Sequence, residues 1–416
     1  MHTEAVGCWV GVDWGGKEHA VCVVGADGVE VTQFTMRQAA GALQGLAERL
    51  RALGPVAGVA VETPRHLLVD VLVEGGYAVY PINPRVSHAW RQCSSVGGAK
   101  DDRRDAWVLA DGLRHHHAKL RAFVPERGPA RVLGLLCEDE CRFIGQRTAL
   151  VQQLEDTLKQ YFPAALEWFS DWTTQTAWDF ILAFPTAAQL ASARPAKLAG
   201  FLRTHRVGLG PVWQKRIAAR TAALDWPCNP DVVAAKSVLA LALAKQLRTV
   251  QATLRDYRKQ IDALFERRED KAVFTSLPGA GRKLAPRLAS AFGTQRDQVE
   301  SADVVQQVTG TAPVTVQSAA HRSVHIRRAC RKDARCTLHH FAWQSLKQSV
   351  WAKAAYSRAR RKGQKHATAL RFVANKWLKI IYRMWQTGEP YDEERYLRQL
   401  TQKKSPIAYD LGLLKT

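Results

Sequence analysis

The first 120 residues alternate short apolar runs with helical patterns, and this alternation limits the possible folds more than any other feature. Strands are expected at residues 8–15, 19–28, 29–35, 56–63 and 77–83. Helices are expected at residues 38–53 and 66–76, after Pro84, and from near Asp102. The resulting order, β-β-β-α-β-α-β-α-α, predicts an α/β sheet that opens with a three-stranded meander.

This order fits a sheet of ribonuclease H-like type, in which the first and fourth strands are neighbours. A Rossmann domain would instead open with a βαβ unit and a GxGxxG turn, and the sequence lacks that turn. The apolar run VAGVAVET at residues 56–63 is typical of a strand that is buried on both faces.

Acidic residues stand where such a sheet would bring them together. Asp13 ends the first strand and Glu62 ends the fourth, while Asp102 and Asp105 are three residues apart and share one helix face. Four carboxylates in one cleft repel each other and stay ionised only if cations hold them. Oxygen ligands of this kind suit Mg²⁺ or Mn²⁺. Two such ions can stabilise the attacking and the leaving oxygen when a phosphodiester bond is cleaved.

A structural interpretation of the same acids remains open. Asp102 and Asp105 also suit a helix N-cap and a first-turn acid, and Asp13 also suits a turn. Asp101 and Asp111 are weaker candidates for the cleft. Asp101 lies off the shared face, and Asp111 lies two turns further along the helix.

The middle of the chain, residues 126–270, changes character. Residues 130–161 and 232–268 have long helical patterns, and a Trp-, Pro- and Ala-rich stretch at 168–230 separates them. An apolar seam of coiled-coil type runs through the second pattern, at Leu239, Leu243, Leu247, Val250, Leu254, Tyr257, Ile261 and Leu264. The pattern indicates a helical spacer or dimerisation arm, and an ordinary helical bundle is the alternative.

Charge separates the ends of the chain. The formal net charge is +22, divided as 0 over residues 1–125, +4 over 126–270 and +18 over 271–416. Such a surplus implies a polyanionic partner, with nucleic acid ahead of an anionic membrane. No apolar run is long enough to span a membrane, and residues 1–14 lack signal-peptide features. The eight cysteines are expected to be reduced thiols in a cytoplasmic protein.

Two basic segments of the last third are candidates for phosphate contacts. Residues 271–416 are expected to be mostly helical, and SLPGAGRKLAPRLASAFG, residues 276–293, predicts a helix end, a tight turn and a second helix, which is the form of a helix-hairpin-helix. The glycines of such a turn let backbone N–H groups approach a phosphate. SRARRKGQKH, residues 357–366, predicts a sequence-blind phosphate surface. The expected nucleic-acid contacts in these segments are Gly279, Gly281, Arg282, Lys283, Arg360, Arg361 and Lys362.

Two further groups in this region have weaker signals. Aromatic residues interleave with the basic ones at Trp343, Trp351, Tyr356, Trp377 and Tyr382, where they either stack on bases or form the core. Cys330, Cys336, His339 and His340 have a loose metal-like spacing without a CxxC pair, which argues against zinc.

Four motifs together resemble the DEDD-type insertion-sequence transposases of the IS-one-ten family, which includes the Piv-type DNA invertases. The strand Asp, the strand-end Glu and the K-x-D-x-x-D-A helix start resemble the family's acidic motif. SLPGAGRKLAPRLASAFG resembles its SIPGIG-type hairpin, and GTAPVTVQS (310–318) its G-x-x-P-x-x-x-x-S motif. Residues 366–396 resemble its closing helix and Pro-Tyr-Asp tail. The similarity covers residues 7–120 and 270–400.

This resemblance implies three regions and a mechanism. They are a RuvC-like nuclease domain (1–125), a helical oligomerisation spacer (126–270) and a basic serine-bearing domain (271–416). Asp13, Glu62, Asp102 and Asp105 would hold Mg²⁺ or Mn²⁺, and Ser318 would attack DNA and form a phosphoserine ester. Arg322, Arg327 and Arg328 would stabilise the pentacovalent phosphate.

The resemblance also implies partners. A structured guide RNA, the bridge RNA, would pair with donor and target DNA. Because recombination involves two duplexes and four strands, we also expect a homodimer or homotetramer. The chain departs from the family where Ala319, in place of Gly, follows the serine, and where residues 327–336 lack a Gly-Asn pair.

Two other functions remain open at this point. One is a metal-dependent, structure-specific nuclease of junction-resolvase type, in which Ser318 is only structural. From the residues alone, Ser318 is a loop hydroxyl that suits a turn or cap. The other is a non-catalytic nucleic-acid-binding protein, which would leave the four acids unexplained.

Overall fold

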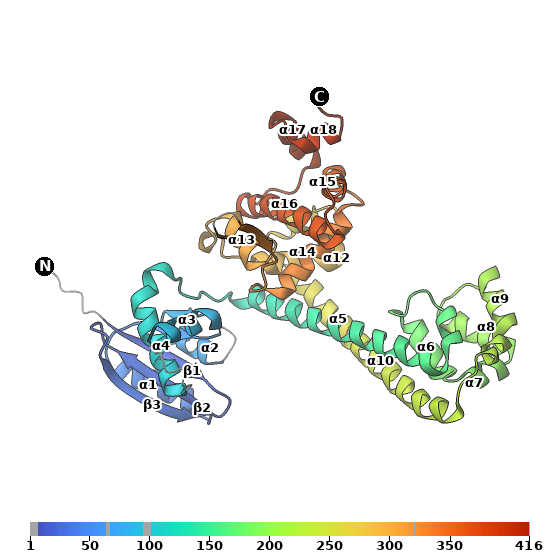
Figure 1. Ribbon diagram of the computed structural model, residues 1–416, viewed down its shortest axis with the longest axis horizontal. Coiled ribbons are helices and arrows are strands. Elements are labelled where there is room, and N and C mark those ends of the chain that lie inside the picture. Colours follow the sequence, from blue (N-terminus) through green and yellow to red (C-terminus); the bar gives the residue numbers. More distant parts are fainter. Residues whose placement is uncertain (1–6, 64–66, 95–100, 319–320, 416) are drawn as a thin grey trace. The chain divides into compact units, whose positions relative to one another are not determined.

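The computed structural model describes residues 7–63, 67–94, 101–318 and 321–415. Contacts between residues divide the chain into two compact units, residues 1–125 and 126–416 (Figure 1). The first unit contains the sheet, and the second is built mainly from helices. Each unit is described by itself.

The first unit has a mixed five-stranded sheet with the order β3-β2-β1-β4-β5. Its strands are β1 (Cys8–Trp14), β2 (Glu18–Val24), β3 (Glu30–Arg37), β4 (Val56–Val61) and β5 (Val79–Pro81). The first three strands pair antiparallel, and β1, β4 and β5 pair in parallel. The predicted element order and the predicted pairing of the first and fourth strands are confirmed.

Helices cover the sheet on both faces because its central strands are apolar on both. They are α1 (Ala42–Ala52), α2 (Leu67–Glu74), α3 (Pro84–Ser94) and α4 (Asp102–His116), and a short 3₁₀ turn follows at His117–Lys119. Val10 and Val59 pack in one cluster with residues of α1 and α2, while Trp9 and Ala60 pack in another with residues of α4. A Cβ at Gly11 would lie 2.0 Å from the Ala106 carbonyl oxygen, so α4 rests directly on β1.

In the second unit, two long helices form an antiparallel pair, here called the arm. They are α5 (Gly128–Tyr161) and α10 (Pro230–Glu266). Arg147 hydrogen-bonds Gln251, and Glu140 hydrogen-bonds Arg258. Residue numbers therefore rise along α5 as they fall along α10, which makes the pair antiparallel. Much of the predicted seam is used within the chain, since Leu247 and Ile261 are fully buried, but Leu239 is 43% exposed.

The Trp-rich stretch folds into a small helical bundle at one end of the arm. It contains α6 (Gln175–Ala183), α7 (Ala187–Ser192), α8 (Pro195–Thr204), α9 (Pro211–Ala218) and 3₁₀ turns at Pro163–Glu167 and Ala219–Asp225. Trp178 and Phe180 are fully buried in its core, together with Leu158 of α5 and Ala244 of α10. The arm and the bundle therefore share one core.

The rest of the second unit is a helical domain with one hairpin. Its helices are α11 (Lys271–Thr275), α12 (Gly281–Phe292), α13 (Ala302–Val308), α14 (Lys332–Ser345), α15 (Val350–Arg361), α16 (His366–Thr387), α17 (Glu393–Gln402) and α18 (Pro406–Asp410). A 3₁₀ turn spans Arg296–Gln298, and the hairpin consists of β6 (Val314–Ser318) and β7 (His321–His325).

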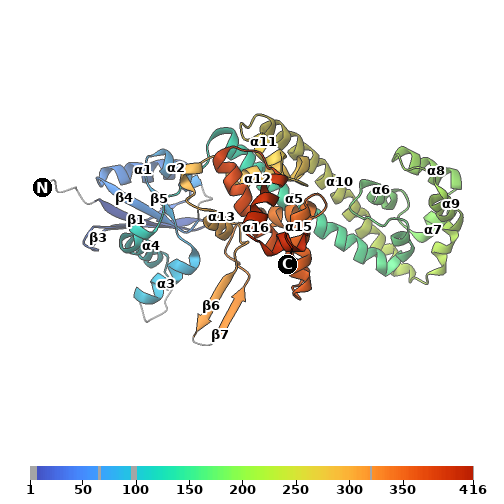
Figure 2. The same cartoon turned by 90° about the horizontal axis from the view of Figure 1, so that it is seen from above.

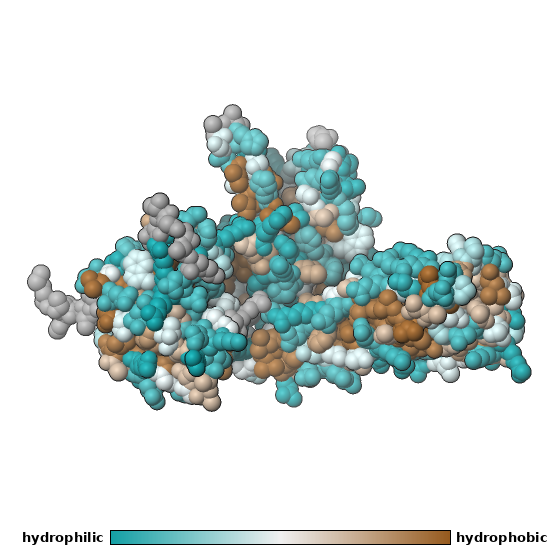
Figure 3. All heavy atoms as spheres, turned by 60° about the horizontal axis from the view of Figure 1, so that its bottom comes forward, coloured by the Kyte–Doolittle hydropathy of each residue, from teal (hydrophilic) through white to brown (hydrophobic). Residues whose placement is uncertain are grey.

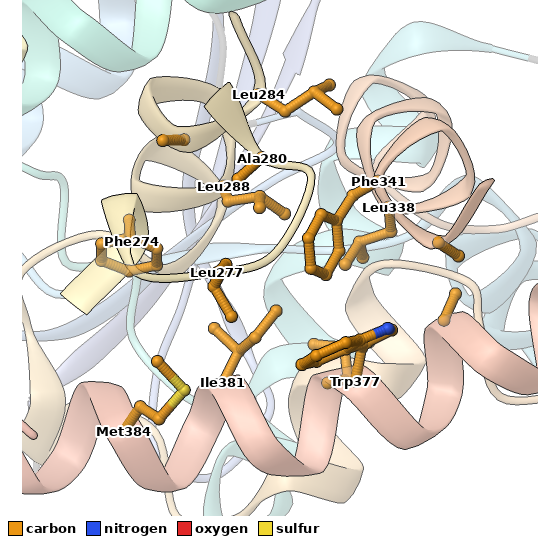
Figure 4. Packing of buried hydrophobic residues seen from close by; sticks show 14 of the residues in the cluster. Phe274, Leu277, Ala280, Leu284, Leu288, Leu338, Phe341, Trp377, Ile381 and Met384 are labelled. Atoms are coloured by element: carbon orange, nitrogen blue, oxygen red, sulfur yellow. The ribbon is translucent and has the colours of Figure 1, made fainter. Parts of the chain in front are cut away.

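In the core of this domain, Trp377 and Ile381 extend from α16 toward Phe341 and Leu277, which come from the facing segments (Figure 4). Trp351 is also fully buried, so Trp351 and Trp377 belong to the core. Trp343 differs from them, because 43% of its surface is exposed.

One buried ion cluster joins this core to the arm. Glu140 of α5 pairs with Arg258 of α10 and with Arg287 of α12, whose Nη2 lies 2.7 Å from Oε2. Glu140 and Arg287 are both buried. No helix among the described residues is long and apolar enough to cross a membrane.

Candidate functional site

Asp13 and Glu62 stand at the same end of two neighbouring parallel strands. Gly11 lies beside Ala60 and Val12 beside Val61, and Asp13 and Glu62 are the residues that directly follow this last pair. Gly11 and Ala60 face α4, and side chains two positions further along a strand point to the same face. The alternation of β1 therefore points Asp13 toward the side on which α4 packs, while Glu62 lies in the bend that follows β4.

Helix α4 presents its own acids from its first turn. Asp101 is the N-cap, and its side chain accepts a hydrogen bond of 3.3 Å from the backbone N–H of Arg103. The N-cap role considered for Asp102 therefore belongs to Asp101, while Asp102 and Asp105 are first-turn acids. Asp102 is exposed and Asp105 is buried. Asp111 pairs with Arg114 at 2.8 Å.

Helix α3 supplies partners for two of these acids, and the sequence reasoning missed both. The Ser87 hydroxyl donates a 2.8 Å hydrogen bond to Glu62 Oε1, and Arg91 Nε lies 2.6 Å from Asp105 Oδ1. Ser87 and Arg91 are four residues apart, so they share one face of α3. The spacing of four residues within a predicted helix was the sequence signal that could have identified Ser87 and Arg91 as neighbours on one helix face.

The oxygen donors of this site are of the kind that Mg²⁺ or Mn²⁺ prefers. Within the described ranges, however, no three His, Cys, Asp or Glu side chains are arranged to hold one ion. The Arg91 guanidinium instead supplies positive charge at Asp105. The donors fit a hard cation in kind, and the metal centre stays a prediction. Cys330, Cys336, His339 and His340, all among the described residues, do not form such a group either.

Ser318 is the last residue of β6, where it pairs with His321 of β7 (Figure 2). The serine was expected in a loop, but it lies at the end of a hairpin strand because residues 314–318 and 321–325 form a ladder. Ala319, where the chain departs from the family pattern, lies outside the described residues. The Ser318 side chain is exposed, and none of the described residues hydrogen-bonds its hydroxyl.

Other residues of the serine motif and its neighbours have defined places. Gly310 has φ +69°, and a Cβ there would lie 2.5 Å from Cys330 Sγ, so the motif needs glycine at this position. Arg322 pairs with Gln317 across the hairpin and is exposed. Arg328 is exposed and Arg327 is half-buried.

The predicted order of a helix end, a turn and a second helix at 276–293 is present: α11 ends at Thr275, a turn follows, and α12 begins at Gly281. Gly279 has φ +83°, and a Cβ there would lie 2.8 Å from the Gln344 backbone, so packing on α14 already requires glycine. Gly281 begins α12 with open space around it. Lys283 is exposed, and the exposed Arg282 pairs with Asp262 at 2.6 Å.

The second predicted phosphate surface lies at the end of α15. Arg360, Arg361 and Lys362 are all exposed. Arg361 Nη2 lies 2.9 Å from Asp410 Oδ1, and Arg360 donates to the Gln364 carbonyl at 2.7 Å. Part of this basic charge is therefore neutralised within the chain.

Curated relatives resemble the chain over almost its whole length. The "Mini-circle putative transposase for IS117" of Streptomyces coelicolor is 28% identical over 97% of this chain and 99% of that protein. The "Insertion element IS900 uncharacterized 42 kDa protein" of Mycobacterium paratuberculosis is 24% identical over 92% of this chain and 96% of its own length.

Two family models match separate parts of the chain and together span more than half of it. The first, DEDD_Tnp_IS110, is described as a transposase and matches residues 10–163, which include all four candidate acids. The second, described as the transposase IS116/IS110/IS902 family, matches residues 271–357, which include Ser318. The chain therefore belongs to the IS110/IS116 family of transposases.

Proposed function

We propose that this transposase, as an enzyme that cuts and rejoins DNA, works through a serine ester and a carboxylate site. Ser318 is the proposed nucleophile, and Asp13, Glu62, Asp102 and Asp105 are the proposed carboxylates. The observation that carries the proposal is that Asp13 and Glu62 lie at the same end of the adjacent parallel strands β1 and β4. A meander followed by parallel strands with acids at these ends supports a ribonuclease H-like, RuvC-like fold.

In the proposed step, the Ser318 oxygen attacks the phosphorus of a DNA phosphodiester. The oxygen–phosphorus bond to Ser318 forms while the bond from phosphorus to one deoxyribose oxygen breaks. The serine gives up its proton, and the leaving deoxyribose oxygen takes one up. The resulting ester conserves the phosphodiester free energy, so a second deoxyribose hydroxyl can reverse the step without ATP.

A divalent cation held by the four acids would supply positive charge for the attacking and leaving oxygens. Within the chain, Ser87 orients Glu62 and Arg91 orients Asp105. Arg322, Arg327 and Arg328 follow the hairpin turn, where guanidinium groups suit a phosphate that gains negative charge.

The hairpin and its basic surroundings suit donor and target DNA and a structured guide RNA. A two-stranded hairpin with exposed side chains is marginal by itself in water, and a ribbon of this size enters a nucleic-acid groove. The net charge of +18 over residues 271–416 supports contacts to more than one polyanion. The guide RNA itself rests on the family resemblance.

The arm is the proposed oligomer interface. Part of its apolar seam is buried against other helices of the same chain, but Val238 is 67% exposed and Leu239 is 43% exposed. Figure 3 shows apolar surface along the arm. A groove between the two helices of the arm is lined by Leu150 of α5 and Val250 of α10. Recombination joins four DNA strands, so we expect a homodimer or homotetramer on DNA.

The test is to trap the serine ester. The protein is incubated with donor and target DNA, flanking noncoding RNA and Mg²⁺, then denatured and resolved on a gel. We expect a protein–DNA adduct that Ser318→Ala abolishes and that the matched hairpin variant Ser323→Ala retains. Nicked DNA with free ends and no adduct would overturn the ester mechanism and favour a junction-type nuclease.

A further inference from the structure

A cavity of about 570 Å³ opens in the second unit next to the base of the hairpin. Ile326, which directly follows β7, forms part of its wall. The polar part of the wall comes from α14 and the start of α16, and consists of Lys332, Arg335, His339, His340 and His366. Among the described residues, no carboxylate lines this cavity.

The positive charge around the cavity is not neutralised by the protein. Elsewhere in the second unit, arginines such as Arg282, Arg358 and Arg268 have carboxylate partners. Within the part of the chain that the structure describes, neither Arg335 nor Arg371 has one, and Arg335 donates only to the Arg327 carbonyl, at 3.1 Å. Partly buried charges are normally paired, so this cluster indicates an anionic ligand.

The pKa of His339 also reflects the excess of positive charge around the cavity. Burial, and after it the positive charges of Arg371 and Arg335, together lower the pKa of His339 to about 4. Its Nε2 is buried and has no hydrogen-bond partner among the described residues. His339 is therefore a neutral imidazole that lies near two guanidinium groups and has one ring nitrogen without a partner among the described residues. Such a group can hydrogen-bond a polar ligand that enters the cavity.

An aromatic face completes the cavity. Trp343 lines it and is the exposed tryptophan of the basic domain's aromatic series. The His366 ring stands edge-on to Trp343, with ring centres 5.2 Å apart, and is held by a 2.8 Å hydrogen bond between its Nδ1 and the Tyr356 hydroxyl. An exposed indole beside cations suits an unstacked base and its phosphate.

We propose that this cavity binds one unpaired nucleotide, with its base against Trp343 and its phosphate on Arg335 and Lys332. The inference rests on the proposed nucleic-acid binding of the second unit and adds a specific site to it. The five residues of β7 separate the cavity from the hairpin tip by about 17 Å at 3.3–3.4 Å per residue. The cavity therefore positions a strand and does not contact the phosphate at Ser318.

The test compares labelled oligonucleotides of one sequence as single-stranded RNA, single-stranded DNA and blunt duplex DNA, using the full chain. Loss of a stacked base costs about 1–3 kcal/mol, which is roughly 5- to 150-fold in affinity. We expect Trp343→Ala and Arg335→Ala to weaken single-strand binding by at least about fivefold, and duplex binding by much less. The single strand that loses more, RNA or DNA, identifies the natural occupant.

Matched controls separate this effect from misfolding. Trp226→Ala removes a tryptophan of similar exposure outside the cavity, and Arg142→Ala removes an arginine of the arm. Both should bind as the wild type does, and Trp343→Phe should restore most of the single-strand affinity. Equal losses on duplex and single strands, or none, would overturn the nucleotide site. A wild-type protein that binds no nucleic acid would instead overturn the proposed function.

Discussion

The candidate sites of the two units gather charge of opposite sign. The first unit is formally neutral, yet its sheet brings Asp13 and Glu62 to one end, and Asp13 points toward the helix that carries Asp102 and Asp105. The second unit carries the basic surplus and leaves Arg335 and Arg371 without carboxylate partners among the described residues. Charge is thus sorted by position in each fold, which a net charge for the whole chain does not reveal.

The second unit also shows the difference between structural and ligand-binding cations. Arg258 and Arg287 both contact the buried Glu140, and together they join the arm to the core. Arg335 and Arg371, around the cavity, have no such carboxylate among the residues that the structure describes. A charged group that is paired inside the fold stabilises it, whereas one that lacks a partner is available to a ligand.

The largest expected effect tests whether both units take part in one reaction. Asp13→Ala and Ser318→Ala should each lower recombination by roughly 10²–10³-fold or more, because each removes a group that acts on the reacting phosphate. Recombination of a reporter plasmid with the flanking RNA supplied measures this loss. Mixing the two variants also tests complementation between subunits.

Glu74→Ala is the matched control for the acid variant, because Glu74 is an exposed acid of α2. It should recombine as the wild type does. Full activity of Asp13→Ala would remove the acidic unit from the mechanism and break the comparison between the two units.

The next effect concerns stability. Glu140→Ala should lower the free energy of unfolding by about 3–5 kcal/mol, because it leaves the buried guanidinium of Arg287 and the partly buried one of Arg258 without their carboxylate partner. Urea unfolding followed by circular dichroism measures the change. If Glu140→Ala does not fold, Glu140→Gln should give a smaller loss of the same sign.

Asp256→Ala is the control for this change, since Asp256 forms an exposed pair with Lys259 on the same helix as Arg258. Its cost should stay below about 1 kcal/mol. Equal costs for the Glu140 and Asp256 variants would mean that the buried cluster does not hold the arm to the core.

A smaller effect on stability is expected in the turn between α11 and α12, where it tests whether a glycine is needed for packing or only for phosphate binding. Both Gly279 and Gly281 have positive φ, so alanine at either costs about 1–2 kcal/mol. Gly279→Ala should cost a further 1–3 kcal/mol or so, because its Cβ would meet the backbone of α14. Thermal unfolding of the two variants should therefore differ, and identical melting temperatures would contradict the packing role.

The smallest effect is a pH dependence at the cavity. The pKa of His339 is about 4 in the folded chain, below the ordinary histidine value of about 6.5. The unfolded chain therefore binds the proton first, and the folded state loses stability as pH falls from about 6.5 to 4. His339→Gln should flatten urea-unfolding stability over this range, whereas the exposed His321→Gln should not.

Part of the fold was predictable because it depends on local patterns. The strand and helix order of the first unit follows from apolar periodicity, and each predicted strand is present. Asp13 and Glu62 could be paired in advance because parallel strands in a known order align their ends. The partners on α3 were not predicted, because a Ser and an Arg four residues apart on a helix are common.

The sequence by itself determined the element order, the positions of the acids and the basic character of the last third. Tertiary structure decided which partners the same residues have. It made Asp101 the cap, placed Ser318 at the end of a hairpin strand, and used Gly279 for helix packing. It also buried Trp377 and exposed Trp343, although both lie in helical patterns. The reason is physical: periodicity depends on near neighbours, whereas burial and pairing depend on residues that only folding brings together.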